Sequence, residues 1–121
     1  KQIWKKDINS KIYSSQAVNQ KHVYVCTAAG FVYCLDVETG KTIWQARTNS
    51  IVNTIPLLSG DVLYVGCTDK TLYAFDSITG SILWQYKTEG RIKKILAAAK
   101  HFLFLFVEDR SIIALQEKVM P

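Results

Sequence analysis

Hydrophobic residues along this chain fall in short runs that are bounded by turn residues. In the second third of the sequence the runs cover 51–58, 62–67, 71–75 and 81–86, and Ser-Gly-Asp, Thr-Asp-Lys and Asp-to-Gly segments separate them. Runs of this length, rich in β-branched and aromatic residues and punctuated by turn residues, are typical of antiparallel strands. The pattern therefore predicts an all-β chain in which four short strands follow one another.

The same pattern recurs every 40 residues without any insertion. The recurring turn and aromatic residues form a repeat signature at Trp4, Asp36, Gly40, Trp44, Asp76, Gly80 and Trp84. A period of about 40 residues with four strands in each copy is typical of a β-propeller blade. We expect residues 1–121 to form one propeller segment of three four-stranded antiparallel repeats. Their approximate bounds are 12–46, 52–86 and 92–116, with residues 2–5 as a leading outer strand.

The signature residues have a structural explanation. Asp36 and Asp76 each open a turn in which the carboxylate can accept hydrogen bonds from the backbone amides that follow. Gly40 and Gly80 close these turns, because glycine tolerates a positive φ. The tryptophan four residues later is large and flat enough to cover the seam between two blades while its indole N–H donates to a carbonyl. We interpret the signature as structural rather than catalytic.

Residues 23–44, which run from Val-Tyr-Val-Cys-Thr to Gly-Lys-Thr-Ile-Trp, and their copy at 63–84 resemble the pyrroloquinoline-quinone (PQQ)-type repeat. This repeat builds the quinoprotein-dehydrogenase-like propellers, and its tryptophan-docking pattern is similar to Ala74-x-Asp76-x-x-Thr79-Gly80-x-x-x-Trp84. The resemblance implies a propeller built from such blades. It does not imply one activity, because the family includes enzymes, assembly scaffolds and sensor domains.

Three repeats leave two apolar ends, whereas propellers typically have four to eight blades. The last repeat has Gln116 where the others have Asp, and no Gly-Lys-x-x-Trp follows it. It therefore lacks the outer strand, which is the kind of strand predicted at the start of the chain. We expect self-association, a protein partner or a further part of the same protein to complete the ring. A six-bladed homodimer and a fragment of a larger propeller both fit.

A PQQ-dependent dehydrogenase would need carboxylate and amide ligands for Ca²⁺, a catalytic Asp and, in many relatives, adjacent cysteines. The cysteines at 26, 34 and 67 are at least eight residues apart, and His22 and His101 are separated by 79. Neither set has the spacing of a metal site, and phosphate-loop or hydrolase motifs are missing. We therefore expect no catalytic, cofactor-binding or metal-binding residue and no enzymatic activity.

Charge and cysteine usage bear on partners and compartment. Fifteen Lys and Arg against ten Asp and Glu give a net charge of +5, which is ordinary for a folded domain. Basic residues gather at Arg91, Lys93, Lys94 and Lys100, but the aromatic residues that stack on nucleic acid are not interleaved with them. The cysteines fall inside strand-like runs and are expected to be buried and reduced, which favours a cytoplasmic location. The alternative is one disulfide and a free thiol. No apolar run is long enough to span a membrane.

The first strands of the three repeats differ most from one another, and variable positions on a repeated scaffold are where function is expected. In related propellers this strand lines the central channel. Either Tyr13, Asn53 and Lys93 or the alternate set Ser14, Thr54 and Lys94 would converge there. The competing interpretation is that these groups only solvate a water-filled channel.

The run 102–107 is apolar at every position. It is either a strand that is buried on both faces or a sheet edge that awaits a partner. The second interpretation makes Phe104 and Phe106 a candidate interface edge. The leading functional hypothesis is a non-catalytic binding or scaffold module for protein–protein contact, either on its own or as an appended domain of a larger protein. The alternatives are a fragment of a PQQ-dependent dehydrogenase and a basic-surface binder of nucleic acid or anionic lipid.

Overall fold

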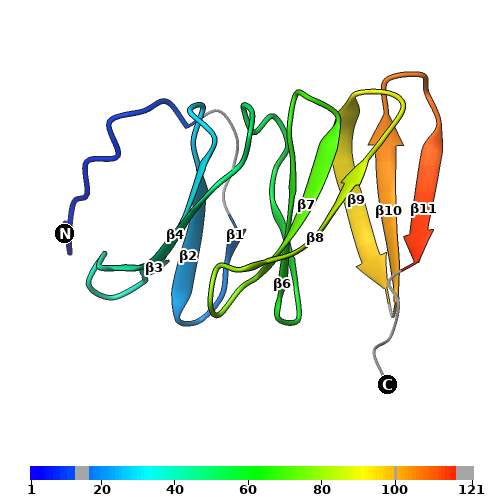
Figure 1. The fold of residues 1–121 in the computed structure, drawn as a ribbon. Helices are drawn as coiled ribbons and strands as arrows, with labels where there is room; N and C mark the ends of the chain where they lie inside the picture. The colour runs from blue at the N-terminus through cyan, green and yellow to red at the C-terminus, as the bar shows by residue number, and fades with distance from the viewer. Residues whose placement is uncertain (13–16, 100, 117–121) are drawn as a thin grey trace.

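The computed structural model describes residues 1–12, 17–99 and 101–116. Its strands form three antiparallel sheets that stand side by side in an open stack (Figure 1). Residue 1 lies at one end of the stack and the last strand at the other (Figure 1). The predicted all-β architecture of successive propeller blades is confirmed.

The sheets follow the chain in sequence order. The first sheet comprises β1 (Ala17–Val18), β2 (His22–Cys26), β3 (Phe31–Asp36) and β4 (Thr42–Arg47). The second comprises β5 (Leu57–Ser59), β6 (Val62–Gly66), β7 (Thr71–Asp76) and β8 (Ile82–Lys87). The third comprises β9 (Ile92–Ala99), β10 (Phe102–Val107) and β11 (Ile112–Gln116). The third repeat was expected to have four strands, but its sheet has three within the described residues.

Residues 40 positions apart occupy the same place in successive sheets. The central hairpins pair in one register, with Tyr24 opposite Cys34, Tyr64 opposite Ala74 and Phe104 opposite Ala114. The outer pairing shifts register after Cys34 in the first sheet and after Ala74 in the second. The repeat in the sequence is therefore also a repeat of backbone geometry, so equivalent residues can be compared directly.

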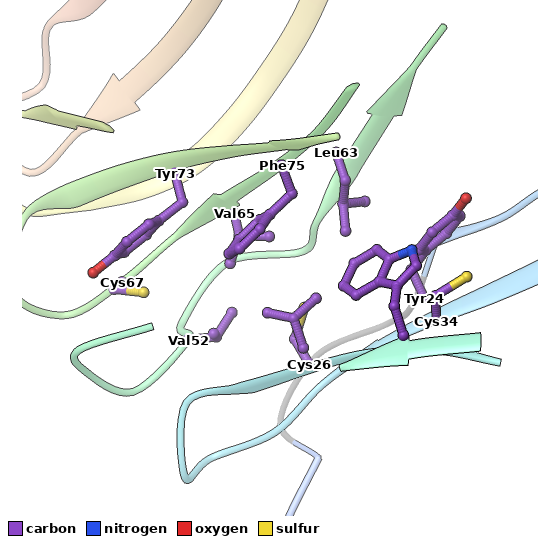
Figure 2. Packing of buried hydrophobic residues seen from close by; sticks show 11 residues of the cluster. Tyr24, Cys26, Cys34, Val52, Leu63, Val65, Cys67, Tyr73 and Phe75 are labelled. Atoms are coloured by element: carbon purple, nitrogen blue, oxygen red, sulfur yellow. The ribbon is translucent and has the colours of Figure 1, made fainter. Parts of the chain in front are cut away.

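Two apolar cores lie between the sheets, because side chains alternate between the two faces of each strand. Between the first and second sheets the buried residues are Tyr24, Cys26, Val32, Cys34, Trp44, Val52, Leu63, Val65, Cys67, Tyr73 and Phe75. Figure 2 shows most of these side chains pointing toward one another from the two facing sheets. Between the second and third sheets they are Tyr64, Leu72, Ala74, Ile92, Ile95, Leu103 and Leu105. Each sheet is thus held mainly by its neighbours.

The first strand of the second repeat is shorter than the predicted run 51–58. Only β5 (Leu57–Ser59) pairs continuously, and Val52 forms an isolated bridge to Cys67. Two local features interrupt the ladder. Pro56 has no backbone N–H to donate, and the Thr54 hydroxyl takes the place of a backbone acceptor, receiving the amide of Gly66 at 3.0 Å.

Residues 2–5 form no strand in the structure, contrary to the expected leading outer strand. A strand needs a neighbouring edge with which to exchange backbone hydrogen bonds. In the described residues no sheet precedes β1, so this segment has no such edge. It nevertheless lies against the first sheet through Trp4, as described below.

Candidate interaction surface

Tryptophan side chains contact the glycine turns across the seams of the stack. Trp44 donates its indole N–H to the carbonyl of Ser77 at 2.9 Å, and its ring lies against Gly80. Trp4 makes the same contacts one sheet earlier, with the carbonyl of Val37 at 3.0 Å and with Gly40. Trp44 and Trp4 therefore contact equivalent turns in the same way. No sheet precedes Trp4 within the described residues.

The turns that receive these rings are built by aspartates. The Asp36 carboxylate accepts the backbone amides of Glu38 at 2.8 Å and Thr39 at 3.1 Å. These two hydrogen bonds stabilise the ionised form and hold the pKa of Asp36 below its ordinary value. Asp76 accepts the amides of Ile78 and Thr79 in the same way. Gly40 and Gly80 have φ angles of 75° and 80°, where a side chain would be strained.

Trp84, at the equivalent position of the second repeat, is only partly buried, whereas Trp44 is 8% exposed. Its ring packs at 5.9 Å from Tyr64. The positions equivalent to Ser77 and Gly80 in the third repeat are 117 and 120, which lie outside the described residues. The signature residue Trp84 thus belongs to the core between the second and third sheets.

The outer face of the third sheet carries exposed apolar side chains on β10 and β11, with Lys94 of β9 opposite Phe106. We call it the third-sheet face, and it consists of Phe104, Phe106, Ile112 and Ala114. Phe106 is 37% exposed and Ile112 is 65% exposed. Phe102 adjoins this face and is 43% exposed. Sequence reasoning missed Ile112 and Ala114, although the 40-residue repeat aligns them with buried residues of the earlier sheets.

Phe104 and Phe106 were predicted at a sheet edge, and this is wrong. Their strand β10 is the middle strand of the third sheet, with β9 on one side and β11 on the other. The run 102–107 is also not buried on both faces. Leu103, Leu105 and Val107 face the second sheet and are at most 1% exposed, while the phenylalanines face outward. The available surface is therefore the face of the sheet rather than the backbone of this strand.

The candidate channel residues are only partly brought together. Tyr13 and Ser14 lie outside the described residues. Asn53 donates from Nδ2 to the carbonyl of Ile92 at 3.3 Å, so it links the second sheet to the third. Its Oδ1 is buried and accepts no hydrogen bond from the described residues. Lys93 and Lys94 follow Ile92 on β9 and are exposed.

The cysteines are buried thiols and not reactive ones. Burial raises the pKa of Cys26 to about 12, with a smaller contribution from nearby Cys67, and raises that of Cys34 and Cys67 to about 11. At neutral pH they are therefore protonated and behave as small apolar side chains. Within the described residues no three His, Cys, Asp or Glu side chains gather in a group that could hold a metal ion.

A polar groove of about 640 Å³ lies beside the loop that leaves the first sheet. Its lining residues are Ala28, Ala29, Arg47, Thr48, Asn49, Ser50 and Ile51. The Arg47 guanidinium lies 5.0 Å from the centre of the Phe31 ring, and the Thr48 hydroxyl donates to backbone carbonyls of the loops. These interactions stabilise the conformation of the loops that line the groove. No helix long and apolar enough to cross a membrane occurs in the part of the chain that the structure describes.

The stacked antiparallel sheets, the 40-residue register and the Asp–Gly turns define blades of a β-propeller of the PQQ-repeat type. A family model described as outer membrane protein assembly factor BamB matches residues 1–118. The chain belongs to this family of PQQ-repeat propellers. Among curated proteins, no sequence is significantly similar to the chain.

Solved structures show the same fold. BamB from Moraxella catarrhalis is 21% identical with a TM-score of 0.76, and the match covers 94% of this chain and 36% of that one. The Cps50 (Swd1) β-propeller domain from Myceliophteria thermophila is 15% identical with a TM-score of 0.75, covering 90% and 37%. The quinohemoprotein alcohol dehydrogenase ADHIIG from Pseudomonas putida HK5 is 21% identical with a TM-score of 0.70, covering 84% and 17%.

These likenesses concern the architecture alone, since all three identities are below a quarter. The chain spans little more than a third of the BamB chain and less than a fifth of the dehydrogenase chain. An assembly factor and an oxidoreductase share these blades, so the fold leaves the choice between binding and catalysis to the residues of this chain.

Proposed function

We propose that this chain is a non-catalytic propeller module that binds protein, as a scaffold or as an appended domain of a larger protein. The observation that carries the proposal is the third-sheet face. Contiguous aromatic and aliphatic side chains exposed on one face of a folded domain mark sites of protein contact. Phe106 and Ile112 of this face and the adjoining Phe102 are all exposed, and they lie on the adjacent strands β10 and β11.

The residues of the chain also support a binding role over a catalytic one. The carboxylates of its repeated acidic residues, Asp36 and Asp76, accept hydrogen bonds from backbone amides of their own turns. Its three thiols have raised pKa values that oppose nucleophilic or metal-binding chemistry. Buried thiols also support the proposal of a reducing, cytoplasmic location.

Surface variants test whether the third-sheet face binds protein. We expect Phe106→Lys to abolish cross-linking of the chain to protein partners, its own copies included, because it replaces the apolar ring opposite Ile112 with a second charge beside Lys94. Tyr86→Lys is the matched control, since Tyr86 is a similarly exposed aromatic residue, at 44%, on the outer strand β8. Equal cross-linking by the two variants would contradict the proposal.

The rival function is that of a PQQ-dependent dehydrogenase fragment, which is suggested by the structural likeness to ADHIIG. It is tested by adding PQQ and Ca²⁺ to the chain and following the quinone absorbance and the thermal unfolding midpoint. We expect neither to change. A shift in both, followed by oxidation of an alcohol, would replace the binding proposal with a catalytic one.

A further inference from the structure

The two ends of the stack carry the two halves of one contact. Between the first and second sheets, the face formed by Tyr24, Cys26, Val32 and Cys34 packs on the face formed by Leu63, Val65, Tyr73 and Phe75. The third-sheet face holds the residues 80 positions after the first set: Phe104, Phe106, Ile112 and Ala114. The outward side of the first sheet, which we call the first-sheet face, holds those 40 positions before the second set: Val23, Val25, Tyr33 and Leu35.

Burial differs between these ends and the interior of the stack. Ile112 is 65% exposed, whereas Val32 and Leu72, at the same place in the other sheets, are fully buried at 0%. On the first-sheet face Tyr33 is partly exposed, whereas its equivalent Tyr73 is 1% exposed. The third-sheet face is therefore exposed where the repeat buries its equivalents. The first-sheet face is exposed only in part, at Val23 and Tyr33, because Val25 and Leu35 are 7% and 2% exposed.

The N-terminal segment already lies where the outer strand of a preceding sheet would lie. The bond from Trp4 to the Val37 carbonyl repeats the bond from Trp44 to the Ser77 carbonyl. The amide of Ala28 donates to the carbonyl of Lys11 at 2.7 Å, as the amide of Thr68 donates to that of Ile51 at 2.9 Å.

Residues 4–11 thus lie against the first sheet in the same way as residues 44–51 lie against the second. The segment occupies the place of a fourth strand, but no sheet in the described residues offers it an edge. The third sheet offers the complementary gap, because β11 pairs with β10 on one side and with no described strand on the other.

The exposed area is also large for a chain of this size. The surface is 7674 Å², whereas a compact monomer of this mass exposes about 6,600 Å². The excess of roughly 1,000 Å² is comparable with the area of about 800 Å² that each partner buries in a standard protein interface.

We propose that two copies of this chain associate head to tail, the third-sheet face of each packing on the first-sheet face of the other. In the same contact, residues 2–7 of each copy, which are equivalent to β4, add to the free edge of β11 in the other as its missing fourth strand. The inference rests on the proposed protein-binding function and names the partner as a second copy. Three sheets from each copy give a ring within the usual range of four to eight blades. Two-fold symmetry makes the two contacts identical.

The repeat fixes the register of the added strand. Phe31 is opposite Arg47 in the first sheet, and Thr71 is opposite Lys87 in the second. Continuing this spacing places Ser111 of one copy opposite Asp7 of the other. Both residues are exposed in the single chain, Asp7 in the segment that precedes the first sheet and Ser111 directly before β11. The N-terminus and β11 lie at opposite ends of the stack (Figure 1).

Cross-linking tests this register. Copies carrying Asp7→Cys are mixed with copies carrying Ser111→Cys and treated with a short thiol cross-linker, and we expect a covalent dimer that contains one copy of each. The matched control replaces Ser111→Cys with Ser81→Cys, an equally exposed serine in the turn before β8. Absence of the cross-link, or equal cross-linking in the control, would overturn the proposed strand addition.

Light scattering tests the association itself. The full chain should have twice the monomer mass of 13.7 kDa across a dilution series. Phe106→Lys should shift it to the monomer mass with an unchanged circular dichroism spectrum, whereas Tyr86→Lys should remain dimeric. A folded wild-type monomer would overturn this inference.

The outcomes separate the inference from the proposed function. A monomer that cross-links to a different protein through the third-sheet face removes the second copy as the partner and leaves the binding function standing. A monomer that cross-links to no protein removes both. Binding of PQQ with alcohol oxidation removes the proposed function, whatever the mass of the chain.

Discussion

The seam between Trp44 and Gly80 offers a test of how the repeat holds its sheets together. A Cβ atom added at Gly80 would lie 2.6 Å from Cδ2 of Trp44, and the φ angle there is 80°. Gly60 provides the matched control, since its φ angle is 59° but an added Cβ would meet nothing within 4 Å. Gly60→Ala therefore measures the backbone cost alone, while Gly80→Ala measures that cost together with displacement of the ring.

The expected magnitudes follow from these two geometries. The left-handed backbone costs a non-glycine residue about 1–2 kcal/mol, which is the whole effect expected for Gly60→Ala. Displacing Trp44 adds about 1–3 kcal/mol of overpacking strain and weakens the hydrogen bond to Ser77, worth about 1 kcal/mol net. We expect Gly80→Ala to lower the free energy of unfolding by about 2–4 kcal/mol more than Gly60→Ala does.

Urea unfolding followed by circular dichroism measures both variants at one fixed chain concentration, because association would otherwise contribute to stability. Combining Gly80→Ala with Trp44→Ala closes a double-mutant cycle that isolates the contact between the two residues. Equal losses for Gly60→Ala and Gly80→Ala, or a cycle with no coupling, would refute the reasoning that Trp44 is held by this glycine.

Four further predictions concern individual side chains. Thr54→Val should destabilise the fold by about 1–3 kcal/mol, because it leaves the buried amide of Gly66 without its acceptor; Thr54→Ser should restore most of this in the same urea assay. The thiols of Cys26, Cys34 and Cys67 should react slowly with a disulfide reagent until the chain is unfolded, and rapid reaction of the folded chain would show that they are not buried. Because their folded pKa values exceed the ordinary thiol value of 9.0, stability should fall as pH rises from about 9 toward 12. The depressed pKa of Asp36 acts oppositely, so its contribution is present above the ordinary value of 3.8 and lost as pH falls through the lower folded value; Asp36→Asn should flatten the acid limb of the stability curve.

The architecture could be predicted from the sequence because it is encoded repeatedly. Gly40 and Gly80, and the tryptophans that follow them, recur at one spacing, and spacing is a property that a single sequence displays. The register of the hairpins follows from the same periodicity, since a one-residue slip would turn Tyr24 and Tyr64 out of the core.

Local and non-periodic features were harder to predict. The strand before Leu57 is cut short by Pro56 and by the Thr54 hydroxyl, and a propensity pattern does not register a side chain that replaces a backbone acceptor. Phe104 and Phe106 were assigned to an edge because an uninterrupted apolar run does not reveal which sides of a strand are paired. Pairing on both sides of β10 became visible only in the structure, and it moved the candidate surface from the edge to the face.

The unlike ends of the stack give its association a direction. A copy carrying Phe106→Lys loses the third-sheet face but keeps the first-sheet face, so it can still receive the third sheet of an unmodified copy. The resulting pair would be joined on one side only and would expose the lysine where the second contact belongs. Because the ring closes with two copies, each variant copy would hold at most one unmodified copy in such a half-joined pair, so the loss of complete dimer should scale with the amount of variant added.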